Sequence, residues 1–464
     1  MSDYNFLMES RLSPEQFRVL NHLSRLAATQ GLNFYLVGGA VRDLTYGQQV
    51  IRDLDFAVEG NAQKLLRQLD SRGSREAASG ESPGVAVEQA QFNKRLGSGE
   101  IIFQNGVRAE VGMCRSEIFA KPGRRPEVYP TTIFEDLKRR DLSINAMAVS
   151  LHPNSRGLLL DPTNGAADIE RRELRVLHSR SLSEDPARIY RLLRLGTRLD
   201  FKPEERTKNL LDSALENRLW QRLDPEMQAR ELRAILHEEN PGKVLRTLAS
   251  HGLLTGLEKK LPASKIPYES FNKVRAVAQT IPGADPYLIN FHCLVERLGG
   301  SQRNRLARKI LGDARTVRLA LGLEGAARKL ARVLSSSKAA LPSQAYDILK
   351  GQPLPILIFL LVKFPQGKIQ NRVKNFVFKA SIVRARLPRA ELQALGVKAG
   401  PKFEKMIEQV FADLLDGRLK TPQQVTKQLR ALAGIKEEAP KTAKAKKARP
   451  KKPAKPAKKT GRKR

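Results

Sequence analysis

Two aspartates separated by one residue, Asp53 and Asp55, are the side chains in this sequence best arranged for chemistry. Side chains alternate between the two faces of a strand, so both carboxylates project from one face if the segment is extended. Paired carboxylates suit a magnesium ion that also binds the phosphates of a nucleotide. Gly38-Gly39 and Arg42 lie shortly before them and suit the phosphates, because a glycine turn exposes backbone N–H groups and Arg42 adds positive charge. The stretch predicts a magnesium-dependent site for a nucleoside triphosphate.

The elements that would position these groups follow from the order of residues 34–58. Phe34–Val37 is a compact apolar run that predicts a strand. The glycine pair then predicts a sharp turn into a short helix that carries Arg42. A second strand is expected to carry both Asp53 and Asp55, which would bring the carboxylates beside the glycine turn.

The next hundred residues predict further strands and hence a mixed sheet. Short strands are expected at 85–87, 100–103 and 107–113, and Asn105-Gly106 between the last two is a hairpin signal. Glu110 is a candidate third carboxylate if its strand lies beside the one that carries the aspartates. A glutamate on a solvent-exposed strand face is an equally good interpretation.

A polar loop and a helix are expected to complete this first domain. Residues 115–131 contain three prolines and predict the loop. Thr132–Glu135 has the pattern of a capping box, so we expect it to begin a helix that holds Arg139, Arg140 and Asp141. The domain is expected to close near residue 177.

From Ser183 onward the pattern is that of amphipathic helices. Asp185, Arg188, Arg191 and Arg194 recur three residues apart and would form one polar stripe on a helix that begins at Ser183. Such a stripe can be an ordinary surface salt bridge, worth only ~0.3–0.5 kcal/mol per pair. It can equally be a set of side chains that contacts a ligand.

Charge and cysteine content limit the classes of protein to which the chain can belong. The 464 residues carry a net charge of +35, which indicates a polyanionic partner such as nucleic acid. Residues 441–464 contain thirteen Lys or Arg and no acidic residue, so we expect a disordered tail, yet more than half of the net charge lies outside it. Cys114 and Cys293 are far apart, which argues against a zinc finger or a disulfide framework and favours the reducing cytoplasm. Neither a signal peptide nor a bilayer-spanning run is expected.

Several motifs, taken in their order along the chain, resemble those of the CCA-adding tRNA nucleotidyltransferases and the bacterial poly(A) polymerases. In RRDLSINAMA, Leu142 and Ser143 replace the Phe and Thr of the family, and residues 70–91 match the family poorly. A segment at 396–405 (GVKAGPKFEK) is similar to a C-terminal element of some CCA-adding relatives. The motifs that carry the resemblance are GGAVRD at 38–43, RDLD at 52–55, RRDLSINAMA at 139–148, LLLDPTNGAADI at 158–169 and EDPARIYRLLR at 184–194.

The resemblance implies roles for individual residues. It implies that Asp53 and Asp55 bind Mg²⁺ and that Glu110 completes the catalytic carboxylates. It implies contacts to the incoming nucleotide from Gly38, Gly39, Arg42 and Arg140, with Asp141 and Asn145 orienting the ribose or bracing that element. A simple strand-end cap is as good an interpretation of Asn145. The resemblance further implies that Asp185 and Arg188 read the Watson–Crick edge of the base, and that Arg191 and Arg194 support the base pocket or contact phosphate.

The resemblance thus implies template-independent addition of CCA, or of CC or A alone, to the 3′ end of tRNA from CTP and ATP by a two-metal mechanism. Poly(A) synthesis is the alternative, and a non-catalytic RNA-binding descendant is a further one. The oligomeric state stays open. We expect an α+β fold with four parts: a nucleotidyltransferase head with a mixed sheet (1–178), a helical neck with the base-selecting helix (179–255), a helical body and tail that bind RNA (256–435), and a disordered Lys-rich C-terminus (436–464).

Overall fold

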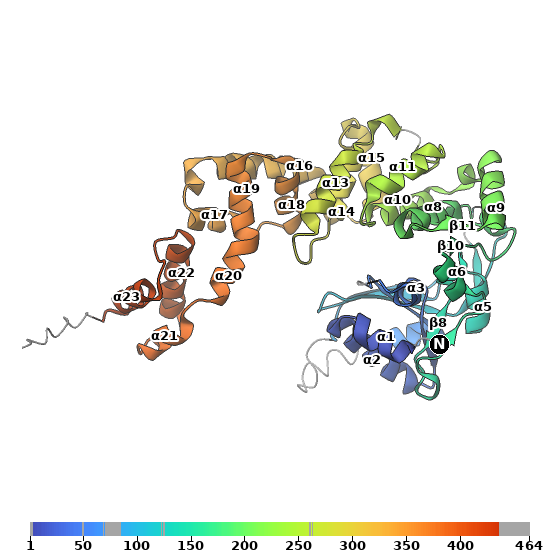
Figure 1. The fold of residues 1–464 in the computed structure, drawn as a ribbon, viewed down its shortest axis with the longest axis horizontal. Helices are drawn as coiled ribbons and strands as arrows, with labels where there is room; N and C mark the ends of the chain where they lie inside the picture. Colours follow the sequence, from blue (N-terminus) through green and yellow to red (C-terminus); the bar gives the residue numbers. More distant parts are fainter. Residues whose placement is uncertain are drawn as a thin grey trace, which may run out of the picture. The chain divides into compact units, whose positions relative to one another are not determined.

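A computed structural model describes residues 3–48, 51–67, 69, 85–121, 123, 126–258, 261 and 263–435 (Figure 1). The predicted disordered C-terminus, 436–464, lies outside these residues, as does most of the poorly matching stretch 70–91. Two compact units can be distinguished among the described residues. One contains the residues up to Arg328 together with Pro353–Lys363, and the other contains Lys329–Gln352 and the described residues from Phe364 onward.

A seven-stranded sheet forms the centre of the N-terminal part of the first unit. Its strand order is β3-β4-β5-β2-β1-β8-β9. β2 and β5 run parallel, whereas the other neighbouring pairs are antiparallel, so the sheet is mixed. The predicted α+β class with a mixed sheet is therefore confirmed. The strands are β1 (Asn33–Val37), β2 (Leu54–Glu59), β3 (Val87–Asn93), β4 (Ser98–Phe103), β5 (Arg108–Met113), β8 (Ala148–Ser150) and β9 (Leu159–Leu160).

The strand-turn-helix order predicted for residues 34–58 is confirmed in outline. Four consecutive side chains of β1 are buried, and Gly38 turns the chain with φ +68° into α3 (Gly39–Tyr46). One detail of the prediction is wrong. Asp53 lies just before β2 rather than on it, so only Asp55 of the pair belongs to the strand. Asp53 is exposed and Asp55 is half-buried.

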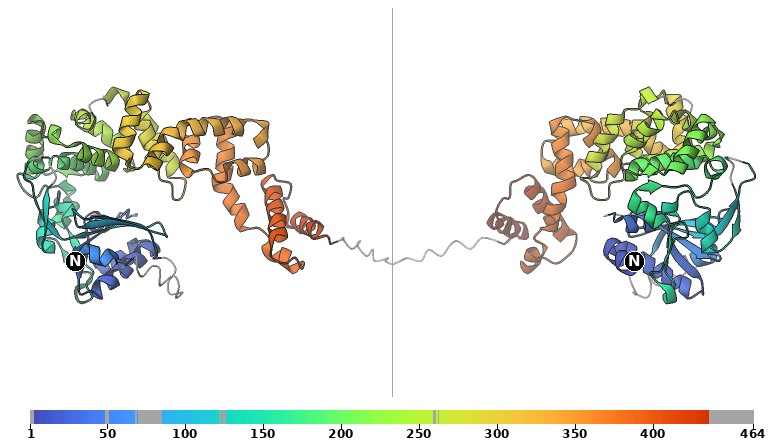
Figure 2. Two further views of the ribbon diagram at one scale, coloured as in Figure 1. Left: turned by 180° about the vertical axis from the view of Figure 1, so that it is seen from behind. Right: turned by 45° about the vertical axis from the view of Figure 1, so that its right-hand side comes forward.

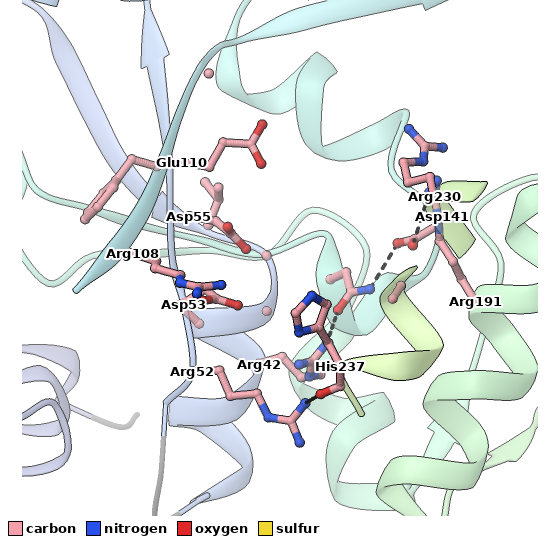
Figure 3. Close-up of a pocket in the computed structure, with 18 of the residues that line it drawn as sticks. Arg42, Arg52, Asp53, Asp55, Arg108, Glu110, Asp141, Arg191, Arg230 and His237 are labelled. Atoms are coloured by element: carbon pink, nitrogen blue, oxygen red, sulfur yellow. Dashed lines mark hydrogen bonds and ion pairs between the residues drawn. The ribbon is translucent and has the colours of Figure 1, made fainter. Parts of the chain in front are cut away.

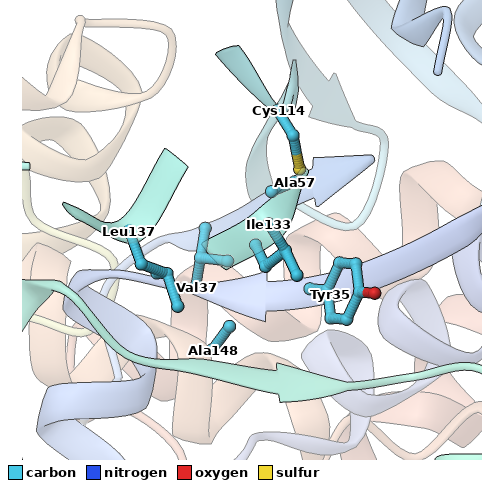
Figure 4. Close-up of a cluster of buried hydrophobic side chains, with 7 residues drawn as sticks. All are labelled: Tyr35, Val37, Ala57, Cys114, Ile133, Leu137 and Ala148. Atoms are coloured by element: carbon cyan, nitrogen blue, oxygen red, sulfur yellow. The ribbon is translucent and has the colours of Figure 1, made fainter. Parts of the chain in front are cut away.

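Helices cover this sheet and enclose an apolar core. α1 (Tyr4–Arg11) is followed by α2 (Pro14–Ala28), whose first turn is closed by a capping box between Ser13 and Gln16. A cluster of buried side chains from β1, β2, α5 (Ile133–Lys138) and β8 packs at the sheet. Figure 4 shows its members, Tyr35, Val37, Ala57, Cys114, Ile133, Leu137 and Ala148.

The prediction of a loop at residues 115–131 is wrong. β6 (Arg115–Ile118) and β7 (Glu127–Pro130) form an antiparallel two-stranded sheet instead. Pro130 pairs with Arg115 at the end of the hairpin, where a residue without an N–H group is tolerated. Pro126 and Pro130 therefore flank β7 at its start and end rather than mark the absence of a strand, and Pro122 lies outside the described residues.

The prediction of a capping box at Thr132 is also wrong. The Thr132 side chain makes no capping hydrogen bond, and the backbone N–H of Ile133 donates to the Glu59 carboxylate at 2.7 Å. α5 ends at Lys138, so Arg139, Arg140 and Asp141 follow the helix rather than lie within it. A carboxylate from β2, distant in sequence, has taken the place of the local cap.

Helices follow the sheet in the rest of the first unit. The prediction that Asp185 lies on the same helix as the three arginines is wrong. Asp185 caps the C-terminus of α7 (Ser181–Glu184) and precedes α8 (Ala187–Leu199), which carries the arginines. The other helices are α6 (Gly165–Arg171), α9 (Glu205–Glu216), α10 (Pro225–Leu236), α11 (Pro241–Ser250), α12 (Leu254–Leu257), α13 (Tyr268–Ala278), α14 (Tyr287–Val295), α15 (Gly300–Leu311) and α18 (Leu354–Lys363), and β10 (Glu173–Leu174) pairs with β11 (Lys202–Pro203).

The described part of the second unit is helical (Figure 2). α16 (Ala314–Ser335) contains the boundary between the units. Phe403, Ile407 and Val410 of α22 (Pro401–Leu415) pack with Leu392 and Leu429 in one apolar cluster of the second unit. No helix in the described ranges has the length and apolar character needed to cross a bilayer. The elements are α17 (Pro342–Leu349), α19 (Gly367–Lys374), a π-helix (Asn375–Lys379), α20 (Ala380–Ala385), α21 (Arg389–Ala394), α22 (Pro401–Leu415) and α23 (Pro422–Ala433).

Candidate active site

A cavity of about 1460 Å³ in the first unit brings the predicted site residues together. β2, β5, α3, the segment after α5, α8 and α10 contribute to its walls (Figure 3). All thirteen candidates from the sequence line it: Gly38, Gly39, Arg42, Asp53, Asp55, Glu110, Arg140, Asp141, Asn145, Asp185, Arg188, Arg191 and Arg194.

Three carboxylates lie on one wall of this cavity. β2 and β5 are parallel neighbours, and Asp55 is paired in register with Glu110. Burial, followed by the negative charges of Glu110 and Asp53, raises the pKa of Asp55 to about 7. Within the described residues, no three acidic, histidine or cysteine side chains converge closely enough to enclose a metal ion by themselves. The wall therefore carries negative charge that the nearby side chains do not fully neutralise.

Arg140 is fixed beside the glycine turn by a buried aspartate that sequence reasoning missed. Asp136 is 1% exposed, and its Oδ2 accepts hydrogen bonds from Arg140 Nε at 3.2 Å and Nη2 at 2.9 Å. Burial opposes ionisation of Asp136, but Arg140 and Arg139 hold its pKa below the usual value. A Cβ added at Gly38 would lie 3.0 Å from Arg140 Nη1. The turn thus needs glycine both for its positive φ and for the approach of Arg140.

Hydrogen bonds through Asn145 link α3 to the segment after α5. Arg42 Nη1 donates to Asn145 Oδ1 at 2.6 Å, and Asn145 Nδ2 donates to Asp141 Oδ1 at 3.1 Å. Arg42 is 4% exposed and also donates from Nε to Asp43 at 2.7 Å. Asn145 ends a short 3₁₀-helix and is no strand-end cap, so its observed contacts are those of a brace.

Asp185 and Arg188 are buried at the start of α8, which argues against a solvent-exposed salt bridge. They are 6% and 5% exposed, and Arg188 Nε lies 3.8 Å from Asp185 Oδ2. The Arg188 guanidinium is held in place because Nη1 donates to Ser181 Oγ and Nη2 to the Arg139 carbonyl, both at 2.7 Å. Asp185 Oδ1 accepts from the backbone N–H of Ala187 at 3.0 Å. Asp185 Oδ2 is beyond hydrogen-bond distance of both Arg188 and Arg191.

Arg191 connects Asp141 and Asp185 to α10. Its guanidinium lies 3.7 Å from Asp141, 3.9 Å from Asp185 and 3.3 Å from Glu231. Burial alone would lower the pKa of Arg191, but Glu231 and then Asp185 raise it, so the side chain stays charged. Arg194 similarly donates to Glu238 at 2.6 Å.

Glu231 and Glu238 were missed because each looks like a solvated charge on an amphipathic helix. Both are buried, at 2% and 3% exposed. Glu231 lies on α10, whereas Glu238 follows the end of that helix at Leu236, so no shared helical face in the sequence pointed to both.

Comparisons with known proteins agree with this geometry. Residues 34–175 match the family model described as the poly A polymerase head domain. The chain is 26% identical over 430 residues to an A-adding tRNA nucleotidyltransferase of Geobacter sulfurreducens, covering 89% of this chain and 47% of that protein. It is 36% identical over 256 residues to a CC-adding tRNA nucleotidyltransferase of Deinococcus radiodurans, covering 53% of this chain and 62% of that protein.

The fold also matches a solved structure. A CCA-adding enzyme in apo form II superposes with a TM-score of 0.50 at 25% identity, covering 93% of this chain and 99% of the other. The match spans about half the length of the first curated relative and less than two thirds of the second.

Proposed function

Because the chain belongs to the family of CCA-adding tRNA nucleotidyltransferases and bacterial poly(A) polymerases, we propose that it is an RNA 3′-end nucleotidyltransferase. It adds CCA, CC or A to tRNA from CTP and ATP without a nucleic-acid template. One observation carries this proposal: residues from four separate motifs line one cavity, with carboxylates on β2 and β5 and a buried Asp-Arg pair at the start of α8.

Asp53 and Asp55 would hold Mg²⁺. The carboxylate wall fits such an ion, because Asp55 and Glu110 are adjacent, and because burial, followed by repulsion from Glu110 and Asp53, raises the pKa of Asp55, which a nearby cation would offset. Two carboxylates with the remaining ligands from phosphate and water are the usual donor set of Mg²⁺ at nucleotide sites. When bound, the ion supplies charge neutralisation at the triphosphate and activates the 3′-hydroxyl of the RNA.

The side chains of the protein mainly position the reactants. The N–H groups at Gly39 and the guanidinium of Arg140 would hold the triphosphate, while Asp136 keeps Arg140 in place. Arg42 is already committed to Asp43 and Asn145, so it would contribute charge and brace the turn more than it would grip a phosphate. Positioning and fixed charge account for most of the barrier reduction in reactions of this kind.

Asp185 and Arg188 would select the base. Arg can donate to the acceptors of C or A, and Asp185 Oδ2 can accept from the exocyclic amino group that both bases carry. The guanidinium fixed by Ser181 and by the Arg139 carbonyl presents a rigid edge, which supports discrimination against UTP and GTP. Arg191 would hold Asp185 and Asp141 in register through its contacts to both.

The remaining helices, and the basic residues outside the described ranges, would bind the RNA backbone through phosphates. We also propose a cytoplasmic location, because Cys114 and Cys293 are both buried free thiols.

The test is addition of single nucleotides to defined RNA ends. tRNA transcripts ending at the discriminator base, in C and in CC are each offered one triphosphate at a time, beside oligo(A). CMP addition to the first two ends and AMP addition to the third indicates CCA synthesis, and a subset of these indicates CC or A addition. Long AMP tracts on oligo(A) would instead favour poly(A) synthesis. No incorporation into any RNA would overturn the proposal.

A further inference from the structure

Two buried carboxylates on one side of the cavity are shared among four arginines. Asp43, 8% exposed, contacts Arg42 at 2.7 Å and Arg198 at 3.7 Å. Both arginines line the cavity, one from α3 and the other from the last turn of α8. The single negative charge of Asp43 therefore faces two positive charges.

Glu238 is shared in the same way. It contacts Arg194 at 2.6 Å, Arg52 at 3.4 Å and Arg198 at 3.9 Å. Arg52 directly precedes Asp53 in the sequence, and Figure 3 shows it near Arg42 on the Asp53 side of the cavity. Four guanidinium groups thus meet two carboxylates, which leaves two positive charges beside the proposed metal carboxylates.

Arg198 is the group in this cluster whose donors are not used. Its side chain is 20% exposed, and its two acidic neighbours lie at 3.7 and 3.9 Å, beyond hydrogen-bond distance. Among the residues that the structure describes, no hydrogen bond to its guanidinium is found, whereas Arg42 and Arg194 each donate at 2.7 Å or less. Burial, followed by the charge of Arg42, lowers the pKa of Arg198 to about 10, so it remains a cation at neutral pH.

We propose that Arg198 and Arg52 form a phosphate-binding subsite, completed by the charge of Arg42, on the side of the cavity next to Asp53. A guanidinium offers a planar fork that matches two phosphate oxygens, and charge-assisted hydrogen bonds of this type are the strong ones. The two excess positive charges suit a phosphate group, which either the triphosphate or the RNA backbone supplies. The choice between these sources rests on the proposed function, whereas the subsite itself rests on the unused donors of Arg198.

The experiment measures phosphate binding directly in the full chain. Calorimetry with inorganic tripolyphosphate forms one arm, and fluorescence anisotropy with a labelled tRNA ending in CC forms the other. Arg198→Met removes the charge and Arg198→Lys keeps it without the fork. Arg171→Met is the matched control, since Arg171 is 65% exposed on α6 and does not line the cavity. Circular dichroism and thermal unfolding establish that each variant is folded.

We expect Arg198→Met to weaken binding of one probe about tenfold or more, as loss of a hydrogen bond to a charged group does. Arg198→Lys should recover part of that loss, and Arg171→Met should change nothing. Weakened tripolyphosphate binding assigns the subsite to the triphosphate, and weakened tRNA binding alone assigns it to the RNA backbone. Unchanged binding of both probes by folded Arg198→Met and Arg198→Lys would overturn the subsite. That result would leave the proposed function standing if wild-type protein still transfers nucleotides. Conversely, a wild type without transferase activity would not affect the tripolyphosphate arm.

Discussion

Asp55 of β2 and Glu110 of β5 occupy matched positions on neighbouring parallel strands, so two carboxylates distant in sequence share one wall of the cavity. The negative charge of Glu110 is the largest contribution of any single side chain to the raised pKa of Asp55. Glu110 is therefore electrostatically coupled to the proposed metal ligands, whether or not it touches the ion.

This coupling predicts the metal dependence of a Glu110 variant. Glu110→Gln keeps the shape of the side chain and removes its charge, so the Mg²⁺ concentration for half-maximal activity should rise by ~10-fold. Titrating Mg²⁺ at saturating nucleotide measures this value. Glu88→Gln on the exposed edge strand β3 is the control and should behave as wild type. An unchanged Mg²⁺ requirement for Glu110→Gln would mean that Glu110 is a surface residue of the strand.

The glycine turn predicts a defect that backbone strain alone cannot explain. Gly38→Ala would force a Cβ to within 3.0 Å of Arg140 Nη1 at a φ of +68°. Gly31→Ala is the matched control, because Gly31 has a φ of +65° and no atom within 4 Å of the added Cβ. Both variants should lose ~1–2 kcal/mol of stability. Only Gly38→Ala should also lose ~10–100-fold in kcat/KM for the nucleotide. Equal kinetics in the two variants would refute a role for this turn in triphosphate binding.

Substituting Asp185 should impair base selection more than it lowers the rate of nucleotide transfer. Removing Asp185 takes away the carboxylate that would accept from the amino group of the base and leaves the buried N–H of Ala187 without its acceptor, and an unpaired buried group costs ~1–3 kcal/mol. Asp185→Ala should therefore relax discrimination against UTP and GTP by about tenfold to a hundredfold. Single-nucleotide incorporation with all four triphosphates on one RNA measures it, with Asp212→Ala on the exposed face of α9 as control. Equal slowing for all four nucleotides would indicate that Asp185 only braces α8.

The basic C-terminus predicts a salt-dependent contribution to RNA binding. Deleting residues 441–464 removes thirteen Lys or Arg, and each lost phosphate contact should reduce the slope of log affinity against log salt by ~0.7–0.9. Binding of tRNA at several salt concentrations measures the slope, while the preference for CTP and ATP should stay as in the full chain. An identical slope after the deletion would exclude the tail from RNA binding.

The sequence was informative where a local pattern determines the structure. The glycine pair between an apolar run and a helix predicted the turn at Gly38, and Asn105-Gly106 predicted the β4–β5 hairpin. The three-residue spacing of Arg188, Arg191 and Arg194 placed them on one helix, and the helix was found.

Contacts between distant segments could not be predicted in this way. Glu59 caps α5 from another element, and the pairing of β6 with β7 overrides the prolines that suggested a loop. Buried acids such as Asp136 and Glu238 are recognised only once their arginine partners are brought near by the fold, because a charged residue normally faces solvent.

The most direct test of the account compares wild type with Asp55→Asn, which preserves side-chain shape and removes one of the proposed metal ligands. Each protein is given tRNA transcripts that end before, within and after CC, with Mg²⁺ and one triphosphate at a time. We expect wild type to incorporate C or A but neither U nor G, and Asp55→Asn to incorporate nothing above background. Asp55→Asn should bind tRNA as wild type does and unfold at the same or a higher temperature in the absence of metal, because a repelling buried charge is gone. Near-normal incorporation by Asp55→Asn would contradict the assignment of this cavity as the active site.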